Sequence, residues 1–139
     1  MTQLQPPLVG RRYPILVPKP DADGLDIAGI RPMQIRVPLG TSTGWNVRAA
    51  SHREPALCGL TGSFIPFAKT KAERTANGDP RWSLEERYSD ANGLVRAVER
   101  ATRELVEQRF LLQEDADRFV AAAKTSDAMQ PAGTAPQNR

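Results

Sequence analysis

The clearest hydrophobic pattern of the chain lies between residues 94 and 107. Residues suited to a buried face recur there at helical spacing, and charged residues fill the opposite face. The inward rows comprise Leu94, Val95, Val98, Ala101, Thr102, Leu105 and Val106, and the charged face comprises Arg96, Glu99, Arg100, Arg103, Glu104 and Glu107. The pattern predicts one amphipathic helix whose apolar stripe packs on other structure.

Shorter helices are predicted around this one from capping signals. Thr70 with Glu73 and Ser83 with Glu86 have the spacing of a capping box, which satisfies free backbone N–H groups at a helix start. The predicted helices are residues 68–76, ended by Asn77-Gly78-Asp79-Pro80, a turn from Leu84 that residues 89–93 interrupt, and residues 115–123 with Phe119 and Val120 as apolar contacts. Residues 125–139 lack periodicity and are expected to form a disordered tail.

The first half of the chain is dense in proline, glycine and β-branched residues. It predicts short strands at Tyr13–Val17 and Met33–Leu39, with an Asp-Gly turn at Asp21–Gly24 between them. The fold class is therefore α+β, in which a half of short strands and loops precedes three or four helices in one small domain over residues 1–124. Such short strands offer little surface beneath the long helix, so its apolar stripe is expected to remain partly uncovered.

Several kinds of chemistry are excluded by composition. Residues 21–24 look like the start of a calcium loop, but Leu25, Asp26 and Pro32 stand where an EF-hand requires an oxygen ligand, glycine and glutamate. The single cysteine, Cys58, allows no internal disulfide and no metal cluster, and fits a buried small hydrophobic residue. No metal and no cofactor are expected.

The charge of the chain is positive but dispersed. Its formal net charge is +3 and its pI about 9.4, yet Arg11-Arg12 is the only adjacent basic pair and no basic cluster is interleaved with aromatic residues. Nucleic acid is therefore not an expected partner. No apolar run approaches the roughly 18 residues of a membrane span, and the first residues of this chain lack the pattern of a signal peptide, so a cytoplasmic location without membrane contact is expected by default.

One motif has the sequence of a nucleophilic serine site, but the residues that would complete a catalytic triad do not follow it in the required order. Gly40-Thr41-Ser42-Thr43-Gly44 has the form G-x-S-x-G, in which a nucleophilic serine occupies a sharp turn between a strand and a helix. In proteins that use this turn for catalysis, an acid and then a histidine follow the serine along the chain. His52 is the only histidine and comes ten positions after Ser42 with no acidic residue between them. The order of a triad is therefore not met within this chain.

Four residues nevertheless stay candidates for a site. Ser42 and His52 are the catalytic candidates, and Trp45 and Asn46 are the candidates for contact with a substrate. His52, with Glu54 nearby, has the position of a catalytic base in a complete enzyme, and its alternative is an exposed loop histidine. Trp45 and Asn46 either line a pocket or anchor their loop on the core.

The motifs around these residues occur together in a known order. They are Tyr13-Pro14-Ile15-Leu16-Val17-Pro18, Asp21-Ala22-Asp23-Gly24, Ala28-Gly29-Ile30-Arg31, Val37-Pro38-Leu39, Thr43-Gly44-Trp45-Asn46, Gly62-Ser63-Phe64-Ile65-Pro66-Phe67-Ala68, Gly78-Asp79-Pro80-Arg81 and Ser83-Leu84-Glu85-Glu86-Arg87-Tyr88. Through them the chain resembles, over about Pro7 to Ala123, the C-terminal region of the bacterial proteins called alpha/beta hydrolase domain-containing proteins. The resemblance implies that the hydrolase core and its serine lie upstream of this segment. It also places tyrosine often at the position of Ser42.

Three interpretations remain open at this point. The chain is a C-terminal fragment or split piece of an ester hydrolase, inactive alone, which pairs with a hydrolase core chain or with itself. Alternatively, it is a stand-alone, non-catalytic module that binds a partner through the apolar face of its long helix. The third interpretation is a small autonomous esterase that uses Ser42 and His52.

Overall fold

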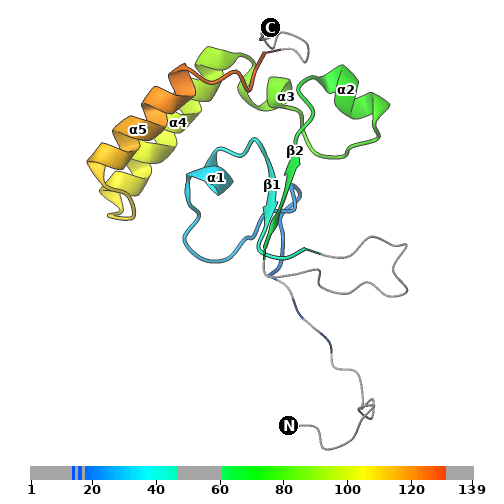
Figure 1. Cartoon of the computed structure of the whole chain (residues 1–139), viewed down its shortest axis with the longest axis horizontal. Coiled ribbons are helices and arrows are strands. Elements are labelled where there is room, and N and C mark those ends of the chain that lie inside the picture. Colours follow the sequence, from blue (N-terminus) through cyan, green and yellow to red (C-terminus); the bar gives the residue numbers. More distant parts are fainter. Residues whose placement is uncertain (1–13, 15, 17, 47–60, 131–139) are drawn as a thin grey trace, which may run out of the picture.

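A computed structural model of the chain describes residues 14, 16, 18–46 and 61–130 (Figure 1). The elements within them are α1 (Met33–Arg36), β1 (Gly40–Thr43), β2 (Ser63–Pro66), α2 (Lys71–Ala76), α3 (Leu84–Tyr88), α4 (Ala91–Glu107) and α5 (Gln113–Lys124). A half of loops and short strands thus precedes a helical half. The expected α+β class is confirmed.

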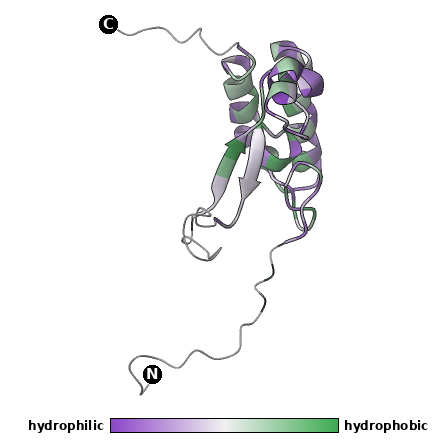
Figure 2. Cartoon of the chain, turned by 90° about the vertical axis from the view of Figure 1, so that its right-hand side faces the viewer, coloured by the Kyte–Doolittle hydropathy of each residue, from purple (hydrophilic) through white to green (hydrophobic). Residues whose placement is uncertain are grey.

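The two strands form one antiparallel hairpin. β1 pairs with β2 in a register that sets Gly40 opposite Pro66 and Thr43 opposite Ser63. In Figure 2 β2 carries the green colour of apolar residues, while β1 is pale. Phe64 and Ile65, the apolar residues of β2, are 60% and 50% exposed. The hairpin therefore presents apolar side chains to solvent.

The prediction of a strand over Met33–Leu39 is wrong. Residues 33–36 form α1, in which the N–H of Val37 donates to the carbonyl of Met33 at 2.9 Å. This turn brings Met33 and Val37, both buried, onto the same side against α4. Pro38 then ends the helix, because the residue before a proline is sterically driven out of the helical region. The other predicted strand, Tyr13–Val17, lies largely outside the described residues.

The long helix and its neighbour form the main core. α4 and α5 lie side by side in opposite directions (Figure 1). Of the inward row of α4, Leu94, Val98, Ala101, Thr102 and Leu105 are buried, and Leu105 is only 2% exposed. The predicted helix and its buried face are confirmed. Their covering comes from α1 on one side and α5 on the other, so the expectation of an uncovered stripe is wrong.

Residues 125–130 also belong to the packed structure. Ala128 and Met129 are partly buried against the core cluster, and the ammonium of Lys69 donates to the carbonyl of Gln130 at 2.6 Å. Residues of this segment, which the sequence assigns to the tail, therefore contact the helical half. Periodicity could not reveal them, since they pack as a turn after α5 rather than as a further helix. Residues 131–139 of the expected tail lie outside the described residues.

The local start and stop signals of the helical half are confirmed. Ser83 caps α3 in a full capping box with Glu86, and the hydroxyl of Thr70 caps α2 by accepting from the N–H of Glu73. At α2 the carboxylate of Glu73 accepts from the N–H of Lys69, one residue before the expected partner. Asp90 caps α4, so the interruption after α3 is shorter than predicted.

Two further features complete the fold. The predicted turn at Asp21–Gly24 is present, with Gly24 at a φ of +77° and the carboxylate of Asp21 accepting from the backbone N–H groups of Asp23 and Leu25. Among the helices described, none joins the length and the apolar character required to cross a bilayer.

Candidate functional site

Ser42 occupies the middle of a strand rather than a catalytic turn. It lies in β1 opposite Phe64, and the chain continues from Thr43 into a bend and not into a helix. A nucleophile elbow requires a strand-to-helix turn that exposes the serine oxygen. The geometry of the G-x-S-x-G sequence in this chain is therefore that of a hairpin.

The first glycine of this motif has a packing role. A Cβ atom built on Gly40 would lie 2.6 Å from the carbonyl oxygen of Ile65 and 2.8 Å from the Cα of Pro66, both on β2. A Cβ on Gly44 would meet nothing within 4 Å. Gly40 thus permits the close approach of the two strands, which accounts for it without any catalytic function.

Ser42 borders an apolar groove of about 330 Å³ between the hairpin and the helices. Its lining residues are Met33, Gln34, Val37, Leu39, Ser42, Phe64, Leu94, Val98, Phe119, Ala122, Ala123 and Ser126. None of these described residues is an acid, a histidine, a lysine or an arginine. A serine nucleophile needs an adjacent base, so this groove is suited to apolar contact and not to proton transfer.

The remaining predicted site residues are not brought to Ser42. Trp45 and Asn46 follow β1 and are half-buried, and neither is among the residues that line the apolar groove. The hydroxyl of Thr43 donates to the carbonyl of Trp45 at 2.5 Å, which fixes the backbone at this bend. His52, Glu54 and Cys58 lie outside the described residues.

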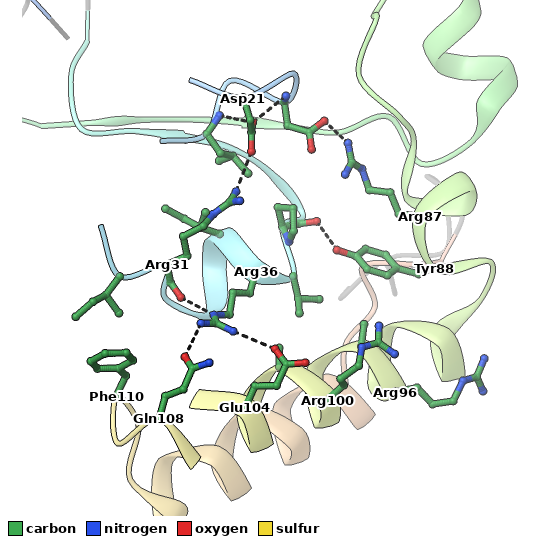
Figure 3. Close-up of a pocket in the computed structure, with 18 of the residues that line it drawn as sticks. Asp21, Arg31, Arg36, Arg87, Tyr88, Arg96, Arg100, Glu104, Gln108 and Phe110 are labelled. Atoms are coloured by element: carbon green, nitrogen blue, oxygen red, sulfur yellow. Dashed lines mark hydrogen bonds and ion pairs between the residues drawn. The ribbon is translucent and has the colours of Figure 1, made fainter. Parts of the chain in front are cut away.

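A larger and strongly charged groove shares Val37 with the apolar groove and otherwise has different lining residues. It has a volume of about 990 Å³ and is bordered by the 21–31 loop, α1, the end of α3, and α4 (Figure 3). Five arginines and three carboxylates line it, namely Arg31, Arg36, Arg87, Arg96 and Arg100 with Asp21, Asp23 and Glu104. No local pattern in the sequence marks this groove, because its lining residues are scattered between Asp21 and Phe110.

Each carboxylate of the groove pairs with a different arginine. Arg31 bonds Asp21 at 2.8 Å, Arg87 bonds Asp23, and Arg36 bonds Glu104 at 3.1 Å. In addition, Arg36 donates to the side-chain carbonyl of Gln108 at 3.0 Å and to the backbone carbonyl of Arg31 at 2.9 Å. Arg36 therefore links α1 to both α4 and the preceding loop, as Figure 3 shows.

The ionisation of two groups in this groove follows from their surroundings. Burial acts to raise the pKa of Asp21, but the backbone N–H groups of Leu25 and Asp23 and the guanidinium of Arg31 outweigh it, so the pKa is lowered. Burial raises the pKa of Tyr88 to about 12, so the phenol is neutral near pH 7. Its hydroxyl donates to the carbonyl of Pro38 at 2.8 Å.

A second set of charged contacts surrounds Phe67, next to the hairpin. The guanidinium carbons of Arg81 and Arg87 lie 5.1 Å and 4.2 Å from the centroid of the buried Phe67 ring. Arg81 also bonds Asp79 at 2.6 Å, the hydroxyl of Thr41 at 2.9 Å and the carbonyl of Ile65 at 3.1 Å. These contacts tie the segment before α3 to both strands.

Two acids of the segment from α2 to α3 are held in their charged form. Hydrogen bonds from Arg81 lower the pKa of Asp79 to about 2, and those from Arg74 lower the pKa of Glu86 to about 2. Both carboxylates are committed to an arginine. The Gly78–Arg81 and Ser83–Tyr88 motifs therefore supply structural contacts in the described part of the chain.

Comparison with known proteins assigns the chain to a family. The family model described as "Alpha/beta hydrolase domain" matches residues 4–121, and the chain belongs to that family. The match covers most of the chain and agrees with the resemblance found in its motifs. Neither the curated proteins nor the solved structures contain a match to the chain.

Proposed function

We propose that this chain is a C-terminal piece of an α/β-hydrolase-type ester hydrolase and that it catalyses no hydrolysis by itself. The observation that carries the proposal is the setting of Ser42, in mid-strand on a groove without an acid or a base among its described lining residues. The family membership supports a connection to hydrolases, while this geometry argues against a working nucleophile in the described residues.

The partner under this proposal is a hydrolase core supplied by another chain, with self-association as the alternative. Two features support an apolar docking surface: the groove beside Ser42 and the exposed Phe64 and Ile65 of β2. The sheet contains just two strands among the described residues, and two-stranded sheets gain stability by packing or by further strands. The hairpin would thus help to close the core of the complete enzyme.

Activity-based labelling tests the absence of catalysis. The purified chain is incubated with a fluorophosphonate probe and with p-nitrophenyl esters of several acyl lengths, alongside its Ser42→Ala variant. We expect no stoichiometric labelling and no turnover that the variant abolishes. Labelling at Ser42 that disappears together with turnover in the variant would contradict the proposal and favour the autonomous esterase.

A second candidate function is a stand-alone binding module, but the buried apolar face of α4 is not free to bind its partner, so the partner would contact another surface. Because α1 and α5 cover the stripe within this chain, the helical half has a core of its own. Light scattering, thermal melting and binding of the dye ANS separate the two candidates. A fragment is expected to self-associate or to bind the dye, whereas a monomer with a sharp cooperative melt and no dye binding would favour the stand-alone module.

A further inference from the structure

The charged groove has an excess of positive charge that its own residues do not neutralise. Its three carboxylates are each paired with one of Arg31, Arg36 and Arg87, which leaves Arg96 and Arg100. Among the described residues, neither of these two arginines has an ion pair or a hydrogen bond to a protein group. Both side chains are exposed on α4.

The spacing of the two arginines is unfavourable for the helix itself. Arg96 and Arg100 are four residues apart, so they neighbour each other on one face of α4 and repel. Glu104, one turn further along, is engaged by Arg36 from α1 and is drawn toward that side of the groove. The contact between α1 and α4 thus occupies the carboxylate that would otherwise be the helical partner of Arg100.

The surroundings of Arg96 and Arg100 suit a small molecule. They line a cavity of about 990 Å³, at the upper end of the range typical of small-molecule sites. In Figure 3 Arg100 lies below Tyr88, and Arg96, one turn earlier on α4, extends to the right of it. Tyr88 stays neutral near pH 7, so its hydroxyl oxygen adds no negative charge that would repel an anion.

We propose that this groove binds a small organic dianion whose oxygens are held by Arg96 and Arg100. Two guanidinium groups without an ion pair in the described part of the chain match two negative charges, and guanidinium forks bind carboxylate and phosphate oxygens through parallel hydrogen bonds. A phosphate monoester and a dicarboxylate share this chemistry. Ser42 does not line this groove, and the site does not depend on the hydrolase proposal.

Calorimetric titration at low ionic strength tests the site with three probes. Phenyl phosphate and phthalate are dianions at pH 7.5, and benzoate is the matched monoanion. We expect at least one dianion to bind measurably and about tenfold more tightly than benzoate. The dianion that binds more tightly shows whether the site prefers a phosphate monoester or a dicarboxylate. Binding of neither dianion, or equal binding of benzoate, would overturn the proposal.

Three variants that each remove one positive charge test whether the dianion binds in the groove. Arg96→Gln and Arg100→Gln are each expected to weaken binding of the preferred dianion about tenfold, since one charged hydrogen bond contributes on that order. Arg103→Gln is the control, because Arg103 is an exposed arginine of the same helix that does not line the groove. An equal loss in the Arg103 variant would mean general charge attraction and would reject the site. These readouts involve no ester, so their failure would leave the labelling result of the hydrolase proposal unaffected.

Discussion

The α4–α5 region and the region formed by the hairpin with α2 and α3 are held together by different contacts. In the first, aliphatic side chains of α4 pack against α1 and α5, with Leu105 almost fully buried. In the second, the single buried aromatic ring of Phe67 lies between two arginines whose guanidinium groups reach acids and backbone carbonyls. One region depends on buried area, and the other on directional polar contacts.

This difference bears on two of the motifs that the chain shares with the family. Apolar packing tolerates exchange among side chains of similar volume, so a helical stripe identifies no particular family. A guanidinium that bonds a carboxylate, a hydroxyl and a carbonyl at once requires arginine at that position. The motifs Gly78–Arg81 and Ser83–Tyr88 supply such contacts, which is consistent with their value in recognising the family.

The largest expected effect comes from the apolar region. Leu105→Ala removes a core side chain that is 2% exposed, and should lower the free energy of unfolding by about 2–5 kcal/mol. Arg103→Ala on the exposed face is the control and should change it by less than about 0.5 kcal/mol. Urea denaturation followed by circular dichroism measures both. Equal effects of the two variants would show that α4 does not pack as described.

The polar region is tested by removing Arg81. Arg81→Ala takes away the bonds to Asp79, Thr41 and Ile65 and should cost about 1.5–3 kcal/mol of unfolding free energy. The control is Arg118→Ala, because Arg118 forms an exposed ion pair with Asp115 within α5, where such pairs contribute little. The same denaturation experiment applies. A loss no greater than that of the control would mean that the contacts of Arg81 do not stabilise the fold.

The two glycines of G-x-S-x-G sharpen the comparison within the hairpin. Gly40→Ala should destabilise the chain by about 1–3 kcal/mol, because the new methyl group would overlap the β2 backbone. Gly44→Ala places its methyl group in open space and should have a much smaller effect. Thermal melts of both variants decide the matter. A larger loss from Gly44 would indicate that the motif has a role other than strand packing.

The smallest effect is expected from acid. Asp79 and Glu86 have pKa values of about 2 in the fold against ordinary values of 3.8 and 4.5. Lowered pKa values stabilise the fold above the ordinary values, and this contribution is lost as pH falls from about 4.5 toward 2. The midpoint of thermal unfolding should therefore decline over that range, and Glu86→Gln should make the decline shallower. An unchanged slope in this variant would show that the Arg74–Glu86 pair is not responsible.

Much of the helical half could be predicted from residue patterns. The stripe from Leu94 to Leu105, the cap at Ser83 and the turn at Gly24 depend on contacts between residues three or four positions apart or on the backbone freedom of one residue. The candidate site could be predicted less well from the sequence. The triad order excludes a complete catalytic site around Ser42, but no local pattern marks the charged groove.

The sequence by itself determined the α+β class, the family, the positions of α2 to α4 and which face of α4 is buried, because these depend on short-range spacing. Only the tertiary structure decided that Met33–Arg36 is helical, that α1 and α5 cover the stripe, and that Ala128 and Met129 join the core. Only there does Arg36 reach Glu104, 68 residues away, and leave Arg96 and Arg100 without an ion pair among the described residues. Such pairings are set when the chain packs, since their energy comes from groups that meet in space and that no spacing along the sequence brings together.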